Sequence, residues 1–190
     1  AGSTFAIPAN SYRLTEPSAT LGSRQDKSVI YQNLDRFNVQ VNFRSGDLTI
    51  GRQAISFGSA RIISPSDVFL PFDEKTLNQE YRIGVDAIRF QKPLNDLSEL
   101  DMGVILGMDG TSENSAVFVQ ALTNRSGADI SGTLMRYSRQ NLIGAGIQSA
   151  IGDFGFWLEA AYVWGDAQYT RLSTGLDYAF SDAVYGMIAY

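Results

Sequence analysis

The chain has 190 residues, 18% of them charged, a formal net charge of −5, and neither cysteine nor histidine. Without cysteine, these 190 residues form no disulfide and provide no thiol nucleophile. Without histidine, they provide no histidine-dependent catalysis or metal binding. The acidic balance provides no basic field, so we expect no nucleic-acid partner. No run of about 18 apolar residues is present, which excludes a spanning helix.

The predicted organisation is a leading segment, 1–28, followed by strands over 29–190. From Phe37 to Arg44 apolar and polar residues alternate, and the polar turn that follows contains Gly46, which suits a hairpin. Alternation resumes at Leu48, but by Ile55 the apolar parity has changed. A β-bulge near Gly51 would explain that change.

Beyond the predicted loop 59–79, alternation continues to the last residue in segments separated by short polar or glycine-containing turns. The clearest alternating segments are 81–90, 100–108, 154–164 and 170–180. We count about ten strands, joined mostly as antiparallel hairpins. The sequence therefore predicts an all-β fold, an antiparallel up-and-down barrel that is either complete or part of a larger barrel.

Such strands fit a soluble barrel or a transmembrane barrel, and the second is favoured. The segments approach the roughly 9–11 residues that a tilted strand needs to cross a bilayer. Aromatic residues such as Phe43, Phe154 and Trp164 stand at predicted strand ends, where an interfacial girdle belongs. The face opposite the apolar one is polar and rich in glycine, unlike a soluble coat of lysine and glutamate.

The segment Leu34–Phe72 carries three local motifs. Asp35-Arg36 opens a strand, Gly51-Arg52-Gln53 follows the hairpin, and Pro65-Ser66-Asp67-Val68-Phe69-Leu70-Pro71-Phe72 forms a loop. Together they resemble the strand–turn–strand–loop signature of porin-like barrels of the Gram-negative outer membrane. The later Tyr81–Ala87 resembles the strand that follows this loop in such proteins. The resemblance implies an outer-membrane location and a channel or scaffold role.

Charged and polar residues within strands are expected to face the lumen, because a charge facing lipid costs about 2–4 kcal/mol at the midplane. Arg136 is one of the arginines to which this applies. The predicted pore-lining residues are Asn38, Gln40, Asn42, Arg52, Arg82, Asp86, Gln148, Glu159, Arg171 and Asp177. Facing arginines and carboxylates would select small polar or charged solutes that diffuse passively.

The loop 59–79 is too apolar to remain loosely solvated, so we expect it to fold against the barrel and narrow or cap it. Its predicted constriction residues are Asp67, Phe69 and Phe72. At Gly51, the expected bulge would turn Arg52 inward to a carboxylate, Asp86 first and Asp67 second, and would give Ile55 and Phe57 the lipid face.

An enzyme is not expected, and neither is a cofactor or a metal. A carboxylate pair such as Asp86 and Asp101 is interpreted as lumen-lining charge rather than as acid–base machinery. The expected partners are outer-membrane lipid and small solutes, with homo-oligomers left open. Two alternatives remain: a non-conducting outer-membrane scaffold that holds a protein partner, and a soluble β-barrel binding protein.

Overall fold

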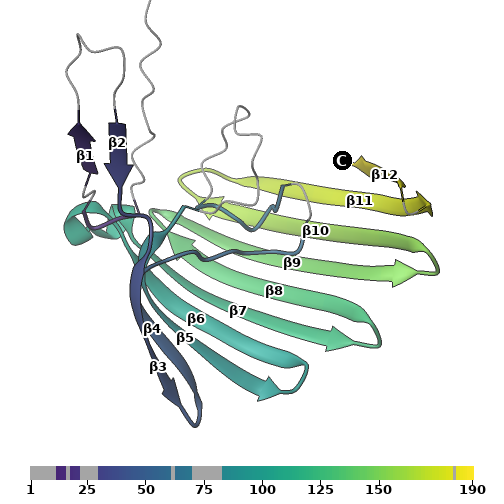
Figure 1. The fold of residues 1–190 in the computed structure, drawn as a ribbon, viewed down its shortest axis with the longest axis horizontal. Coiled ribbons are helices and arrows are strands. Elements are labelled where there is room, and N and C mark those ends of the chain that lie inside the picture. The colour runs from purple at the N-terminus through teal and green to yellow at the C-terminus, as the bar shows by residue number, and fades with distance from the viewer. Residues whose placement is uncertain (1–11, 16–17, 22–29, 61–62, 70–82, 182) are drawn as a thin grey trace, which may run out of the picture.

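One antiparallel sheet of ten strands dominates the computed structural model, which describes residues 12–15, 18–21, 30–60, 63–69, 83–181 and 183–190 (Figure 1). Each strand pairs with the next along the chain. The strands are β3 (Phe37–Phe43), β4 (Gly46–Gln53), β5 (Val85–Asn95), β6 (Ser98–Leu106), β7 (Ala116–Arg125), β8 (Ala128–Tyr137), β9 (Gln140–Ile151), β10 (Phe154–Gly165), β11 (Tyr169–Ser181) and β12 (Val184–Ala189). The predicted all-β fold and its strand number are confirmed.

A separate two-stranded sheet precedes the main one. It pairs β1 (Ser18–Leu21) with β2 (Ile30–Asn33). The described helical elements are two 3₁₀ turns, η1 (Met108–Gly110) and η2 (Ser112–Asn114), which connect β6 to β7. Within the described residues we find no helix with the length and apolar character needed to cross a membrane.

The connections differ between the two ends of the sheet. Tight turns join β3 to β4, β5 to β6, β7 to β8, β9 to β10 and β11 to β12, and we call this end the turn end. The opposite end, here the loop end, carries the long β4–β5 connection and the two 3₁₀ turns. The β7–β8 turn shows why the hairpins are tight. Ser126 and Gly127 both have positive φ, as a type I′ turn requires.

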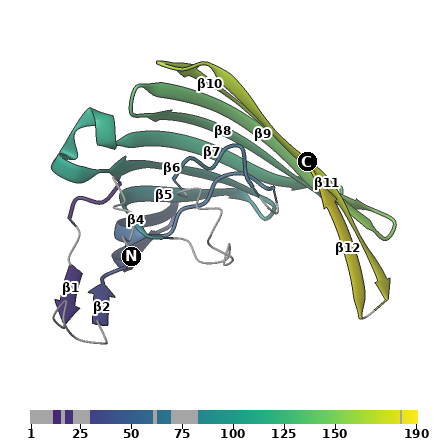
Figure 2. The same cartoon turned by 90° about the horizontal axis from the view of Figure 1, so that it is seen from above.

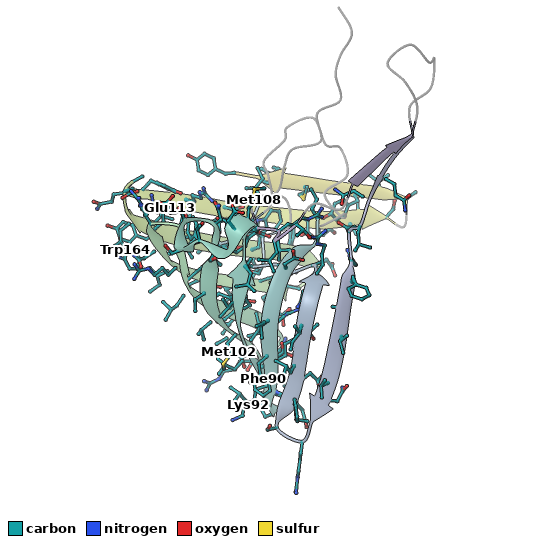
Figure 3. All side chains as sticks on the ribbon, turned by 90° about the vertical axis from the view of Figure 1, so that its left-hand side faces the viewer. Phe90, Lys92, Met102, Met108, Glu113 and Trp164 are labelled. Carbon is teal, nitrogen blue, oxygen red and sulfur yellow. The ribbon has the colours of Figure 1, made fainter. Side chains whose placement is uncertain are left out.

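The two faces of the sheet differ in exposure and in polarity. On the outer face the apolar side chains are exposed, with Leu134 56% and Ile188 80% accessible. Phe90 and Met102 lie midway along β5 and β6 on this face, and Trp164 lies toward its loop end (Figure 3). Its exposed aliphatic and aromatic residues include Val39, Val41, Ile50, Ile88, Val104, Val117, Val119, Leu134, Ile143, Leu158, Leu172, Leu176 and Phe180.

Polar side chains project from the inner face of every strand from β3 to β11. They are Asn38, Gln40, Asn42, Asp47, Thr49, Arg89, Gln91, Glu99, Asp101, Gln120, Asp129, Ser131, Thr133, Gln148, Glu159, Arg171, Ser173 and Asp177. Several of them, including Asp101, Gln120 and Glu159, are buried. The inner face also buries apolar side chains toward the loop end, among them Val85, Ile105, Phe118, Leu142 and Val163. Its polar groups gather toward the turn end, and the opposite, exposed face is apolar, whereas a soluble sheet normally exposes its polar face.

The sheet is curved but not closed, and β3 and β12 are its two edges (Figure 2). After Gln53 the chain leaves β4, and the segment of residues 54–60 and 63–69 crosses the concave inner face (Figures 1 and 2). We call it the inner segment.

The inner segment is held by an aromatic core. Phe57 is completely buried, with its ring 4.8 Å from that of Phe118 on β7 and 5.5 Å from that of Phe69. The expectation that Ile55 and Phe57 face lipid is therefore wrong. The physical reason is that β4 ends at Gln53, so the later parity no longer reports on a strand.

Room for the inner segment is made by glycine on β9. A Cβ added at Gly144 would lie 2.2 Å from the Ser66 hydroxyl, whereas one added at Gly132 on β8 meets nothing within 4 Å. We predict that Gly144→Ala displaces the inner segment and lowers the free energy of unfolding by about 1–3 kcal/mol, the usual cost of overpacking.

The matched variant Gly132→Ala should leave stability unchanged or raise it by less than about 1 kcal/mol, because alanine restricts the unfolded chain. Urea unfolding followed by tryptophan fluorescence measures both. Equal stability of the two variants would show that Gly144 does not accommodate the segment.

Candidate functional site

The centre of the inner face is the carboxylate of Glu159 on β10, which has no exposed surface. Its Oε2 accepts hydrogen bonds from the backbone N–H groups of Ser59 and Ala60, both at 2.8 Å. Its Oε1 accepts from the backbone N–H of Ser66 at 2.9 Å and lies 2.7 Å from the Ser64 hydroxyl. One carboxylate thus binds both described halves of the inner segment to the wall.

Local backbone geometry brings those donors to Glu159. Gly58 has φ +81°, and a Cβ there would lie 2.2 Å from a Glu159 oxygen. On β9, Gly146 leaves space for Ser59 in the same way, since a Cβ would lie 2.5 Å from the Ser59 hydroxyl. Small residues therefore allow the segment to approach the wall closely.

Aromatic side chains continue this contact toward the loop end. The rings of Tyr12 and Phe69 meet edge to face at 4.6 Å. Burial raises the pKa of the Tyr12 hydroxyl above its ordinary value. Asp67 is buried beside Phe69, whose backbone N–H donates to it at 3.3 Å. The two predicted constriction residues within the described part, Asp67 and Phe69, thus lie in the inner segment, and Phe72 lies outside the described residues.

Paired polar groups cover the inner face beside the segment. Arg89 on β5 forms a two-pronged ion pair with Asp101 on β6, with its Nη2 2.7 Å and its Nε 2.9 Å from carboxylate oxygens. Gln91 donates to Glu99 at 3.0 Å. An unpaired buried charge is costly, so these side chains are stable on the inner face because they pair with one another.

Carboxylates outnumber guanidinium groups on the described part of this face. The carboxylates are Asp47, Glu99, Asp101, Asp129, Glu159 and Asp177, and the arginines are Arg89 and Arg171. At the turn end a hollow of about 480 Å³ opens between β5 and β8, with Asp96, Glu99 and Asp129 among its lining residues. The inner surface is therefore negative toward that end.

Most of the predicted pore-lining residues lie on the inner face. Asn38, Gln40 and Asn42 project from it on the edge strand β3, Gln148 lies between Asp129 and Trp157, and Asp177 lies against Gly155. Arg171 donates to the Tyr169 hydroxyl at 3.3 Å and stacks on that ring. Arg82 lies outside the described residues.

Arg52 and Asp86 lie elsewhere. The register of β4 with β3 and β5 runs from Asp47 to Arg52 without a shift, so the expected bulge at Gly51 is wrong. Arg52 keeps the parity of Ile50, yet it is only 4% exposed. Leu34 and residues 12–15 cover its guanidinium on that side, so the side chain does not have to point toward the inner face.

The predicted partner of Arg52 is confirmed. Its Nε and Nη2 each lie 2.9 Å from an Asp86 oxygen, and its Nη1 donates to the Leu34 carbonyl at 2.7 Å. The backbone N–H of Leu14 also donates to Asp86, at 2.8 Å. Beside this pair, Arg13 binds Asp35 at 3.0 Å. The cluster anchors residues 12–15 at the loop end and forms no part of the polar inner face.

Arg136 also departs from expectation. Its register partners are Val117 on β7 and Asn141 on β9, which places it on the outer face, where it is exposed. Because it stands one residue from the end of β8, it lies at the rim rather than at the middle of the apolar face. The rule that strand arginines face inward applies to midplane positions, and this residue is outside its range.

Sequence reasoning missed the Arg89–Asp101 pair and the buried polar group of Gln120, Ser131 and Thr133. The alternation of apolar and polar residues around Met102 and Val119 could have predicted that these polar side chains face inward. Asp86 and Asp101, which could have formed an acid–base pair, lie on opposite faces by register. No three potential metal ligands come together among the residues that the structure describes.

Comparison with known proteins assigns no family. No protein-family model matches the chain, and neither does any curated protein. The porin-like resemblance of Leu34–Phe72 therefore stays a prediction, and function has to be argued from the two faces of the sheet and the inner segment.

We predict that Glu159→Gln releases the inner segment. An amide keeps one acceptor but turns a donor toward backbone N–H groups, and each hydrogen bond to a charged group contributes about 1.5–3 kcal/mol. Hydrogen–deuterium exchange should show lost protection at the amides of Ser59, Ala60 and Ser66. The control Asp129→Asn removes an inner-face carboxylate that binds Asn124 instead, and it should leave those amides protected.

Proposed function

We propose that this chain forms the wall of an outer-membrane porin-like channel for passive diffusion of small polar or charged solutes. The observation that carries the proposal is the exposed apolar outer face of the sheet, opposite an inner face that is polar toward the turn end. A wide apolar surface is exposed on the outer face, while carboxylates, amides and hydroxyls gather on the inner one. Lipid on the outside and water on the inside would satisfy both faces.

The inner segment supports a selective rather than an unobstructed passage. It lies across the concave face and is fixed at Glu159 by three backbone N–H groups. A lumen narrowed by a fixed segment passes small solutes only. A soluble barrel with an apolar interior is the weaker alternative, because its polar groups would be expected outside.

Bilayer insertion is tested by placing a charge on the outer face. We predict that Leu158→Arg strongly lowers the yield of protein inserted into phosphatidylcholine vesicles, because Leu158 faces outward near the middle of β10, where a lipid-facing arginine costs about 2–4 kcal/mol. Asp153→Arg, in the exposed turn between β9 and β10, should insert like the wild type. Soluble wild-type protein that stays out of vesicles would refute the membrane location.

Conduction is tested in planar bilayers. The negative inner face predicts conductance steps with a preference for cations. Replacing Glu99 and Asp129 together by Gln and Asn should reduce that preference, measured as a smaller reversal potential in a salt gradient. Asp153→Asn removes a carboxylate from the same rim but from outside the inner face, and it should change little. Inserted protein without any conductance would favour the scaffold alternative.

A further inference from the structure

A row of side chains crosses the outer face near the loop end. Pairing places Val117 of β7 beside Arg136 of β8, Arg136 beside Asn141 of β9, and Asn141 beside Trp164 of β10. The next row toward the turn end is Val119, Leu134, Ile143 and Tyr162. Arg136 and Asn141 thus bring polar side chains into the outer face between the exposed Val117 and Trp164.

Trp164 indicates what lies at this level. Its ring stacks on Tyr162 at 5.7 Å, and both are exposed on the outer face (Figure 3 labels Trp164). Tryptophan and tyrosine prefer the boundary between hydrocarbon and headgroups, because one end of each side chain is apolar and the other is polar. Arg136 is the penultimate residue of β8 at the loop end, as Trp164 is of β10, so it reaches the headgroup layer when the apolar face meets a bilayer.

The guanidinium of Arg136 accordingly needs an anion. Among the described residues none hydrogen-bonds or ion-pairs with it, whereas Arg52 and Arg89 each have a carboxylate partner. It opens onto a hollow of about 280 Å³ at the rim. Besides Arg136, its lining includes Ser112, Glu113, Val117, Ser138 and Arg139.

The hollow provides the groups that a phosphate needs. Arg139 supplies a second guanidinium, partly neutralised by its ion pair with Glu113. The hydroxyls of Ser112 and Ser138 are further donors, and Val117 continues into the apolar face below. A planar guanidinium fork matches phosphate oxygens in a two-pronged arrangement.

We propose that this rim hollow binds the phosphate of a membrane-lipid headgroup, with Arg136 as the main ligand and Arg139 as the second, while the acyl chains lie along the apolar outer face. The arrangement fits a lipid rather than a free anion, because donors and apolar surface adjoin at one rim. The proposal rests on the bilayer insertion put forward above and adds a lipid preference to it.

Native mass spectrometry of the detergent-solubilised protein with phosphatidylglycerol or phosphatidylcholine tests the site. We expect the wild type to retain phosphatidylglycerol preferentially and Arg136→Gln to weaken that retention roughly tenfold, as the loss of a charge-assisted contact implies. The matched control is Arg125→Gln, which removes an exposed arginine of outer-face parity from the opposite rim of the same hairpin. Its retention should change less than about twofold.

Equal losses in both arginine variants would overturn the proposal, since general charge would then explain the binding. Displacement of the lipid by inorganic phosphate at matched concentration would also overturn it, because the hollow would be a site for free anions. Failure of the wild type to enter phosphatidylcholine vesicles refutes membrane insertion itself. Normal entry with unchanged lipid preference in Arg136→Gln refutes the headgroup site alone.

Discussion

The charge of Glu159 imposes the main constraint on the inside of this protein. A carboxylate without solvent contact must be surrounded by donors, because desolvating an isolated charge costs far more than folding can supply. Here the donors are backbone N–H groups of the inner segment, which leaves the sheet at Gln53. The hydrogen bonds to Glu159 therefore act together with the glycines that admit the segment and the aromatic core of Phe57 to fix its position.

The second constraint is geometric, and it explains why the two faces differ so sharply. Side chains alternate between faces along a strand, so one residue step separates an environment that tolerates charge from one that does not. Charged groups on the outer parity are accordingly either covered, as Arg52 is by residues 12–15 and Leu34, or confined to a rim, as Arg136 is. Both arrangements keep unpaired charge away from the middle of the apolar face.

Periodicity was sufficient to predict the strands, their hairpin connections and the inner or outer parity of residues such as Gln40, Gln148 and Asp177. Local charge logic also found the Arg52–Asp86 pair. It placed that pair wrongly because the covering stretch, residues 12–15, is remote in sequence and nothing near Gly51 reveals it. Phe57 was misplaced for a related reason: alternation beyond Gln53 looks like a strand, although the chain there follows the concave surface.

The contacts of the inner segment link residues that are far apart in the sequence, and this affects when they can form during synthesis. Apart from β4 and β5, neighbouring strands of the sheet are joined by short connections, so most of their pairing is local and can form as successive hairpins. The contact of Ser59 with Glu159 instead spans 100 residues. During synthesis the N–H groups of Ser59 and Ala60 therefore exist long before the carboxylate that binds them. Until β10 is in place, water or another protein has to satisfy those groups, so the inner segment reaches its final position only after most of the sheet has been made.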